Sequence, residues 1–250
     1  MSQSTPDYEV SAEDRGPVRI VVLDRPRKLN AFTAEGYRAL AARLDAAAAD
    51  PDVAVCVLTG RGRAFSAGVD LSAMSRAGGS AELGVAFDPL LDRLARFPKP
   101  LVAAVNGLAV GFGATLLLHC DLVVVDDDAE IRMPFISLGT CAEAGSSWLL
   151  PRRVGPQQAA WMVLSGSALS AAEAVATGFA LERAPAGGAV EHAVALAEQL
   201  AAHGVAALVA NKRLLREGWA EHIAEVWARE KVAMAAIAEE LGPIGWAGTT

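Results

Sequence analysis

Short apolar runs that alternate with helical patterns organise the first half of the chain. Four runs have the length and the β-branched or small apolar content of buried strands: residues 18–23, 53–58, 101–105 and 121–125. Between the first two runs, apolar residues recur at helical spacing after Thr33 until Asp50-Pro51 breaks the pattern. Thr33 is a suitable N-cap for that amphipathic helix. Strands that alternate with helices in this way predict an α/β architecture.

The second half of the chain has a mainly helical pattern. Residues 170–173 read Ser-Ala-Ala-Glu, which is a capping box, and residues 190–241 contain long alanine-rich stretches. We therefore expect a main domain over residues 1–190 and a C-terminal helical region over residues 191–250. Between the second and third strands, the glycines and small polar residues of 75–83 predict a mobile surface loop. The acidic run 126–128 predicts a solvated turn and not a cation site.

Composition indicates a globular protein that needs neither disulfides nor a metal. Of the 250 residues, 53% are hydrophobic and 20% are charged, so disorder is not expected. The net charge of -7 argues against nucleic acid as the main partner, because phosphate binding depends on clustered basic residues. The three cysteines are too scattered for a disulfide framework, and His119 has no ligand pair at zinc-like spacing.

The apolar stretch 101–118 reaches a length at which a membrane span has to be considered. Asn106-Gly107 is a turn signal, however, and Gly111 and Gly113 interrupt the run. We therefore predict a buried strand, a loop and the start of a buried helix, with no membrane span. The first ten residues lack the basic start and apolar core of a secretory signal, so a cytoplasmic location is expected.

Two glycine-containing loops, residues 63–71 and 106–113, each follow a predicted strand and lead into a helix. This is where α/β proteins place their ligands. Neither loop contains a Walker lysine or a complete GxGxxG spacing, so neither predicts a phosphate cradle. Taken alone, each loop is typical of a tight turn.

Taken together, and with Arg25-Pro26, Asn30-Ala31 and residues 98–100 (Pro-Lys-Pro), the two loops resemble the signatures of the crotonase, or enoyl-CoA hydratase/isomerase, superfamily. The resemblance covers roughly residues 15–215. It implies a repeated β-β-α spiral core with a helical C-terminal region and an acyl-CoA thioester as substrate. It also implies that no cofactor is needed beyond the coenzyme A of the substrate, and that the C-terminal helices build a homotrimer or a dimer of trimers.

The resemblance also implies an oxyanion hole for the thioester carbonyl. Matching the motifs assigns its two backbone N–H donors to Ala67 and Phe112. Phe112 would begin a helix, where unpaired N–H groups favour negative charge. Further residues are expected to contact the acyl-CoA: Arg27, Lys28, Ala64, Phe65, Ser66, Gly68, Val69, Asp70, Leu71, Gly111 and Phe135.

Some of these contacts have an equally simple structural explanation. Phe65, Phe112 and Phe135 either line an acyl channel or are buried core aromatics. Arg27 and Lys28 either approach the phosphates of coenzyme A or are solvated surface charges. The sequence leaves both questions open.

The hydratases of this family use two glutamates to handle water, and both are missing here. Thr115 and Phe135 stand in their places. Neither a threonine hydroxyl nor a phenyl ring can act as a general base near neutral pH. This departure argues against hydration of a double bond.

A different carboxylate compensates for the loss. Residues 133–147, with Phe135 after Pro134, resemble the peroxisomal-type delta(3)-delta(2)-enoyl-CoA isomerases, whose catalytic glutamate falls on Glu143. One base suffices to move a proton from C2 to C4 of a 3-enoyl thioester. A lone glutamate can also cap the helix expected near Ser146 or lie on the surface. Within the superfamily, the chain could instead be a dienoyl-CoA isomerase, a hydratase, an enzyme that uses Glu143 as a nucleophile on aryl-CoA, or a non-catalytic acyl-CoA binder.

Overall fold

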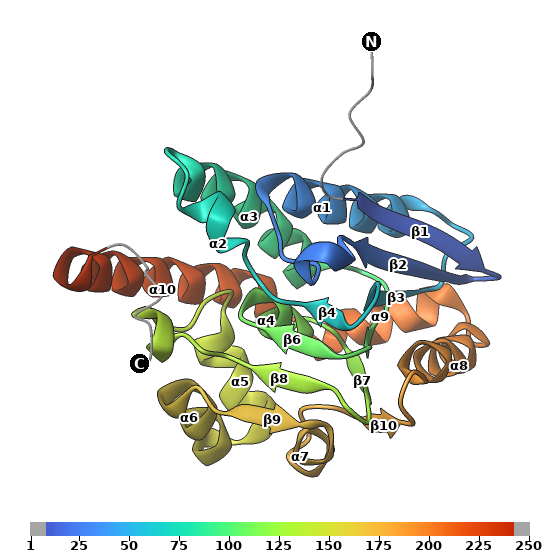
Figure 1. Cartoon of the computed structure of the whole chain (residues 1–250). Helices are drawn as coiled ribbons and strands as arrows, with labels where there is room; N and C mark the ends of the chain where they lie inside the picture. The colour runs from blue at the N-terminus through green and yellow to red at the C-terminus, as the bar shows by residue number, and fades with distance from the viewer. Residues whose placement is uncertain (1–8, 243–250) are drawn as a thin grey trace.

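The computed structural model describes residues 9–242 and contains two β-sheets surrounded by helices (Figure 1). The larger sheet has the order β1-β2-β3-β5-β7-β10. Its strands are β1 (Glu9–Arg15), β2 (Val18–Asp24), β3 (Val55–Gly60), β5 (Leu101–Val105), β7 (Leu122–Asp126) and β10 (Glu182–Ala184). Only β1 and β2 pair antiparallel, and the remaining neighbours are parallel.

The smaller sheet has the order β4-β6-β8-β9 and is built from three-residue strands. These are β4 (Ala64–Ser66), β6 (Leu108–Val110), β8 (Glu130–Arg132) and β9 (Ala168–Ser170). Each of β3, β5 and β7 in the larger sheet is followed by one short strand of the smaller sheet and then by a helix or helical turn. This repetition is the β-β-α spiral that the sequence resemblance implies, so the expected fold class is confirmed.

The centre of the larger sheet is buried on both faces, and its strands β3, β5 and β7 are therefore almost continuously apolar. Along β5, Leu101, Ala103 and Val105 face one hydrophobic cluster, whereas Val102 and Ala104 face the other. Helices α1 (Ala34–Ala49) and α3 (Gly79–Arg96) belong to the first cluster. Helix α8 (Ala189–Ala201) packs on the opposite face of the sheet.

The predicted N-terminal elements are confirmed with small changes in their bounds. The Thr33 side chain accepts a hydrogen bond from Gly36 N and caps α1 as expected. The apolar stretch 101–118 divides into β5, β6 and α4 (Phe112–Leu117). No single helix among the described residues is long and apolar enough to cross a membrane; α8 and α9 (Val205–Leu215) pass such a test only as a pair, bent by 105°.

The C-terminal half is helical, as predicted. It contains α5 (Ser146–Val154), α6 (Pro156–Ser165), α7 (Ala171–Ala176) and α10 (Trp219–Leu241) in addition to α8 and α9. The capping box at the start of α7 is present, with Ser170 and Glu173 bonded reciprocally. Helix α9 packs against the same cluster as α8 through Val205 and Leu208, whereas α10 packs on α3 and α5.

Two local predictions need correction. Residues 75–83 are not a continuous loop, because α3 begins at Gly79 after the short helix α2 (Leu71–Met74) and left-handed Gly78. In the acidic run, Asp126 is not solvated: its side chain is buried and accepts a hydrogen bond from Ala189 N at 2.8 Å. That bond fixes the start of α8, an effect of tertiary packing that local composition does not show.

Candidate active site

The first glycine-containing loop is anchored by a buried ion pair. Asp70 accepts hydrogen bonds from Ser72 N and Ala73 N, which caps α2, and its Oδ2 lies 2.7 Å from Arg25 Nη1. Burial alone would raise the pKa of Asp70, but the hydrogen bond from Ser72 and the Arg25 guanidinium outweigh it and lower the pKa to about 2. The ion pair between Arg25 and Asp70 therefore fixes the conformation of the first loop. This structural role explains why both residues belong to the sequence signature.

Asn30 ties the same loop to the chain before it. Its amide nitrogen donates to Ala64 O at 2.8 Å and its Oδ1 accepts from Arg25 N at 2.8 Å. Ser66 Oγ in turn donates to Asn30 O at 2.9 Å. These buried bonds fix β4 and the turn after it.

The two loops lie against each other because glycine occupies both points of contact. A Cβ atom on Gly68 would lie 2.6 Å from Val110 O and 3.2 Å from Phe112 N, and one on Gly113 would lie 2.3 Å from Ser66 O. Real side chains do not tolerate the shortest of these separations. The sequence motifs are thus brought together at the start of α4, as predicted.

Ala67 does not present a free donor. Its backbone N–H already donates to Leu29 O at 2.9 Å, which contradicts the prediction that this N–H faces a substrate oxygen. The physical reason is the tight connection between the loop and the segment before α1. Sequence matching therefore selected a residue of this loop whose N–H points toward the protein.

Val69 is the loop residue whose N–H is available. Phe32 N donates to Gly68 O at 2.7 Å and Asp70 N donates to Phe32 O at 2.8 Å, which makes a parallel bridge centred on Val69. In a parallel bridge the central residue directs its own N–H away from the partner strand. Across residues 9–242, the N–H groups of Val69 and Phe112 have no hydrogen-bond acceptor.

The aromatic candidates belong to the core in this structure. Phe65 and Phe112 are at most 1% exposed and Phe135 is 3% exposed. The Phe112 ring makes an edge contact with Phe87 at 4.9 Å between centroids, and Phe87 lies 5.2 Å from Trp227 of α10. These contacts link the second loop to α3 and α10.

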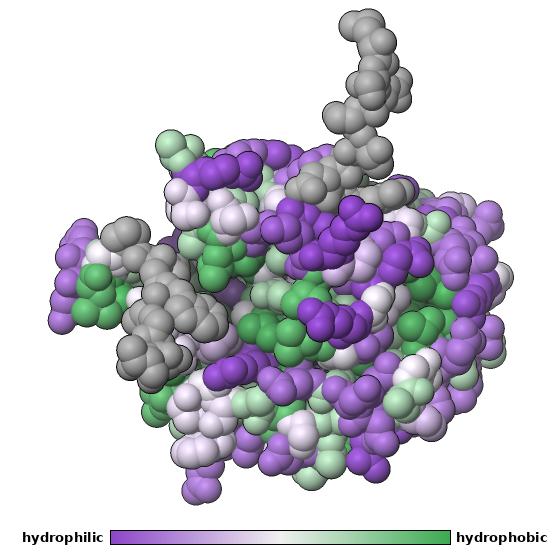
Figure 2. All heavy atoms as spheres, in the orientation of Figure 1, coloured by the Kyte–Doolittle hydropathy of each residue, from purple (hydrophilic) through white to green (hydrophobic). Residues whose placement is uncertain are grey.

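Other predicted contact residues lie at the surface. Arg27 and Lys28 are exposed on the 3-10 helix η1 (Pro26–Lys28), and Leu71 is 39% exposed at the start of α2. Figure 2 shows apolar surface across the middle of this face, where β4 and β6 lie in Figure 1. Ala64, Ser66 and Gly68 are buried beneath it, whereas Gly111 is partly exposed.

The positions where hydratases carry glutamates are apolar or neutral and closed to solvent. Thr115 is fully buried in α4, and its hydroxyl donates to Phe112 O at 3.4 Å. Phe135 begins the turn that leads into the 3-10 helix η2 (Ile136–Leu138). Neither side chain can supply a proton acceptor.

Glu143 is a carboxylate without a hydrogen-bond partner in residues 9–242, and it is partly exposed. Burial of the carboxyl group, together with the negative charge of Glu230, raises its pKa to about 7. Ala144 beside it has a left-handed backbone with φ of 58°, which is uncommon for a residue with a Cβ atom. A carboxyl group with such a pKa can both accept and return a proton near neutral pH.

Two buried groups from elsewhere in the chain hold the segment around Glu143. His119, just after α4, lies with Nε2 2.9 Å from Ala144 O. Glu230 of α10 accepts from Gly145 N at 2.8 Å and from Ser147 N at 2.9 Å. Gly145 is the N-cap of α5 and has no side-chain cap, so the expectation that Glu143 could cap this helix is wrong.

The buried thiols and histidine offer no competing chemistry. Burial raises the pKa of Cys56 and of Cys120 to about 12, which keeps both as neutral thiols. Burial lowers the pKa of His119 to about 4, so its ring is neutral. No group of three metal-ligating side chains occurs in residues 9–242.

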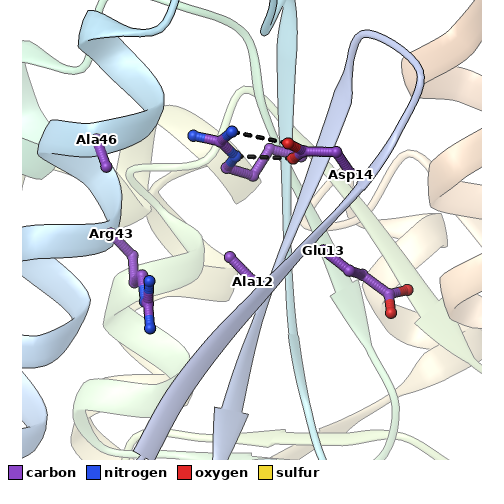
Figure 3. Close-up of a pocket in the computed structure, with 6 residues that line it drawn as sticks. Ala12, Glu13, Asp14, Arg43 and Ala46 are labelled. Carbon is purple, nitrogen blue, oxygen red and sulfur yellow. Dashed lines mark hydrogen bonds and ion pairs between the residues drawn. The ribbon is translucent and has the colours of Figure 1, made fainter.

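A surface pocket of about 250 Å³ lies elsewhere, between β1 and α1 (Figure 3). Asp14 there binds Arg19, which also pairs with Asp50, and Arg43 Nε donates to Val10 O. The two cations of this pocket, Arg19 and Arg43, therefore already have partners, and no candidate site residue lines the pocket.

Comparison with known proteins agrees with the fold. The sequence model of the enoyl-CoA hydratase/isomerase family matches residues 13–240. The chain therefore belongs to this family of acyl-CoA enzymes, the crotonase superfamily.

Relatives include both hydratases and isomerases. The chain is 40% identical over 208 residues to the 2,3-dehydroadipyl-CoA hydratase of Escherichia coli K12, covering 83% of this chain and 81% of the hydratase. It is 38% identical over 175 residues to enoyl-CoA delta isomerase 2 of Rattus norvegicus, covering 68% of this chain and 44% of the isomerase. The crystal structure of an enoyl-CoA hydratase/isomerase from Pseudoalteromonas atlantica superposes with a TM-score of 0.86 at 32% identity, covering 93% and 92% of the two chains.

Proposed function

We propose that the protein is an acyl-CoA isomerase that moves the double bond of a 3-enoyl-CoA to the 2-position, with Glu143 as the base. The observation that carries this proposal is the carboxylate of Glu143, which has no hydrogen-bond partner in residues 9–242, in a chain with no carboxylate at positions 115 and 135. Burial and the charge of Glu230 raise its pKa to about 7, which agrees with a role as the base. A single base with that pKa suits a reaction in which one group both removes and returns a proton.

The reaction balances without any other reactant. The Glu143 carboxylate takes the proton from C2, and the electron pair of that C–H bond delocalises through the double bond and the thioester carbonyl to give a dienolate. The same carboxyl group then delivers the proton to C4, which leaves the double bond between C2 and C3. Because no water takes part, a phenyl ring at position 135, where hydratases carry a water-handling glutamate, favours this reaction over hydration.

Two backbone N–H groups stabilise the dienolate oxygen in this proposal. We assign them to Val69 and Phe112, in place of the pair Ala67 and Phe112, because the Ala67 N–H is already bonded to Leu29. Fixed donors of this kind are worth roughly a hundred- to a thousandfold in rate each. In this proposal the cations Arg27 and Lys28, which are exposed, bind the phosphates of coenzyme A.

The decisive experiment is an isomerase assay on purified protein with a series of 3-enoyl-CoA esters, following the appearance of the conjugated thioester. Glu143→Gln should reduce turnover by at least about a thousandfold, since an amide cannot accept the C2 proton. Glu225→Gln, which removes an exposed carboxylate on α10, is the matched control and should leave turnover unchanged. Near-wild-type turnover in Glu143→Gln would remove Glu143 from the mechanism.

Hydration of 2-enoyl-CoA is the second candidate, favoured by the 40% identity to a hydratase. In that reaction Glu143 would activate water in place of the missing glutamates. The choice of substrate distinguishes the two candidate reactions: a 3-enoyl-CoA tests isomerisation, and crotonyl-CoA tests hydration. An inactive protein that still binds acyl-CoA would instead be a non-catalytic member of the family.

We also propose that copies of this chain assemble into a homotrimer or a dimer of trimers through the C-terminal helices. Three large apolar side chains on α9 and α10 support this: Leu214 is 66%, Leu215 is 78% and Val232 is 72% exposed in the single chain. Light scattering on the purified protein measures the assembly directly. A monomer at micromolar concentration would contradict the proposal.

A further inference from the structure

Helix α10 carries a carboxylate in the middle of its buried face. The buried residues of this helix are Ile223, Val226 and Glu230, which follow one another at helical spacing. A glutamate in such a stripe is costly to bury unless its oxygens are bonded. Glu230 is 5% exposed, and each of its carboxyl oxygens accepts hydrogen bonds.

All of the polar contacts of this carboxylate go to the segment that bears Glu143. Oε2 accepts from Gly145 N at 2.8 Å, and Oε1 accepts from Ser147 N at 2.9 Å and from Ser147 Oγ at 2.6 Å. The backbone oxygen of Glu230 lies 3.8 Å from Cys141 Sγ, on the other side of Glu143 in the sequence. One residue of α10 thus contacts the chain both before and after Glu143.

The helix that presents Glu230 is itself held in place. Trp227 Nε1 and Lys231 Nζ both donate to Asp88 of α3, at 2.8 and 2.9 Å. Ile223 packs so closely on the turn before α5 that a Cβ atom on Gly145 would lie 3.2 Å from its Cγ2. Glu230 therefore contacts residues 145–147 from a helix whose own position is fixed by these contacts.

We propose that Glu230 is a positioning residue for Glu143: its carboxylate fixes residues 145–147, which begin two residues after Glu143, and so sets where the Glu143 side chain lies. The inference rests on the proposed function of Glu143 as the base. Its consequence is that Glu143 is held in the geometry for proton transfer and is kept a stronger base than an isolated glutamate. The raised pKa of Glu143, to which burial and Glu230 both contribute, agrees with this placement.

Few other ionisable groups in residues 9–242 lie close enough in the sequence or structure to change the pKa of Glu143. Cys141 belongs to the same segment, and burial and the two glutamates raise the pKa of its thiol, so it is neutral. His119 contacts Ala144 O from the end of α4 and is neutral because burial lowers its pKa to about 4. Glu230 is therefore the charged neighbour whose removal should change the basicity of Glu143.

The test compares Glu230→Gln with Ser147→Ala and with Glu225→Gln, an exposed position on the same helix. Glu230→Gln removes the charge and one acceptor, so kcat for a 3-enoyl-CoA should fall at least about tenfold with KM within about threefold. The acid limb of its pH–rate profile should move down by about one pH unit. Ser147→Ala removes one bond and no charge, so it should leave that limb in place, and Glu225→Gln should match the wild type in every measurement.

A second readout needs no catalysis. Carbon-13 NMR of protein labelled at the glutamate carboxyl carbons follows the titration of Glu143, whose signal is assigned by its loss in Glu143→Gln. A lower midpoint in Glu230→Gln than in the wild type supports the inference even if the reaction proves not to be isomerisation. An unchanged midpoint together with unchanged kcat overturns it. If Glu230→Gln does not fold, Glu230→Asp keeps the charge but shortens the side chain, and unchanged kcat in that variant overturns the positioning role.

Discussion

His119 donates its Nε2–H to the carbonyl oxygen of Ala144 at 2.9 Å, directly beside Glu143 in the sequence. A carbonyl oxygen can only accept, so the proton of the neutral ring must be on Nε2. The partner of this bond is the left-handed residue Ala144, with φ of 58°. His119 therefore holds a backbone conformation that costs energy and that sets the direction of the Glu143 side chain.

Acid should destabilise the protein through His119. Burial lowers its pKa from 6.5 to about 4 in the folded state, so the unfolded chain binds the proton more readily. The stability contributed by the neutral ring is present above pH 6.5 and is lost as the pH falls toward 4, with a total of roughly 3 kcal/mol. His119→Gln keeps a donor but cannot titrate. Its free energy of unfolding should therefore fall less between pH 7 and pH 4.5 than that of the wild type; equal losses would exclude His119 as the source.

The pH dependence of catalysis should report Glu143. Its pKa is raised to about 7, and the reaction needs the unprotonated base. The value of kcat/KM for a 3-enoyl-CoA should be half-maximal near pH 7 and should fall about tenfold per pH unit below that. A profile that stays flat between pH 5 and pH 9 would be incompatible with Glu143 as the base.

The same raised pKa makes a prediction about stability. Because the folded-state pKa lies above the unfolded value of 4.5, folding favours the protonated form of Glu143, and stability is lost as the pH rises through 7. Glu143→Gln mimics the protonated form. It should be more stable than the wild type by about 1–3 kcal/mol at pH 8.5 and equally stable at pH 4, as measured by urea unfolding at both pH values. A destabilised Glu143→Gln at pH 8.5 would contradict the assigned pKa.

Most of the large elements of the fold could be predicted from the sequence because each carries its own local signal. Buried parallel strands are apolar throughout, and α1 has both a cap and a helical period. The short strands of the second sheet could not be predicted, since three residues such as 64–66 or 108–110 are too few to establish a period. They form only because the larger sheet places them side by side.

The site was predicted in part for a similar reason. Motif order predicted that the two loops meet, which the close approach of Gly68 and Gly113 to the facing loop confirms. The direction of each N–H, however, depends on partners distant in sequence, such as Leu29 for Ala67 and Phe32 for Val69. Glu230 was missed as well. Its only signal is a charge at a buried spacing in α10, and a sequence does not show that Gly145 and Ser147 provide its donors.

Deleting single backbone N–H groups should separate the two candidate donors of the first loop. An amide-to-ester replacement at Val69 removes the N–H that points away from Phe32, and it should lower kcat by roughly a hundredfold or more while stability changes little. The same replacement at Ala67 breaks the bond to Leu29, so it should cost about 1 kcal/mol of stability and have the smaller effect on kcat. The reverse ranking of the two kcat values would restore Ala67 as the donor.

Wild-type protein should hydrate crotonyl-CoA only slowly, because the two positions where hydratases hold water-handling glutamates contain Thr115 and Phe135. Both residues are buried, and the Thr115 hydroxyl is directed to Phe112 O, so neither can orient a water molecule for attack at C3. Glu143 alone can activate water, but the addition also requires a proton delivered to C2, and one carboxyl group cannot do both at once.

The loss of the conjugated thioester absorbance of crotonyl-CoA measures the rate of hydration, and the rise of the same absorbance from a 3-enoyl-CoA measures the rate of isomerisation. We expect isomerisation to exceed hydration by at least about a hundredfold. Hydration that matches isomerisation, and that disappears in Glu143→Gln, would mean that Glu143 is the catalytic residue of a hydratase.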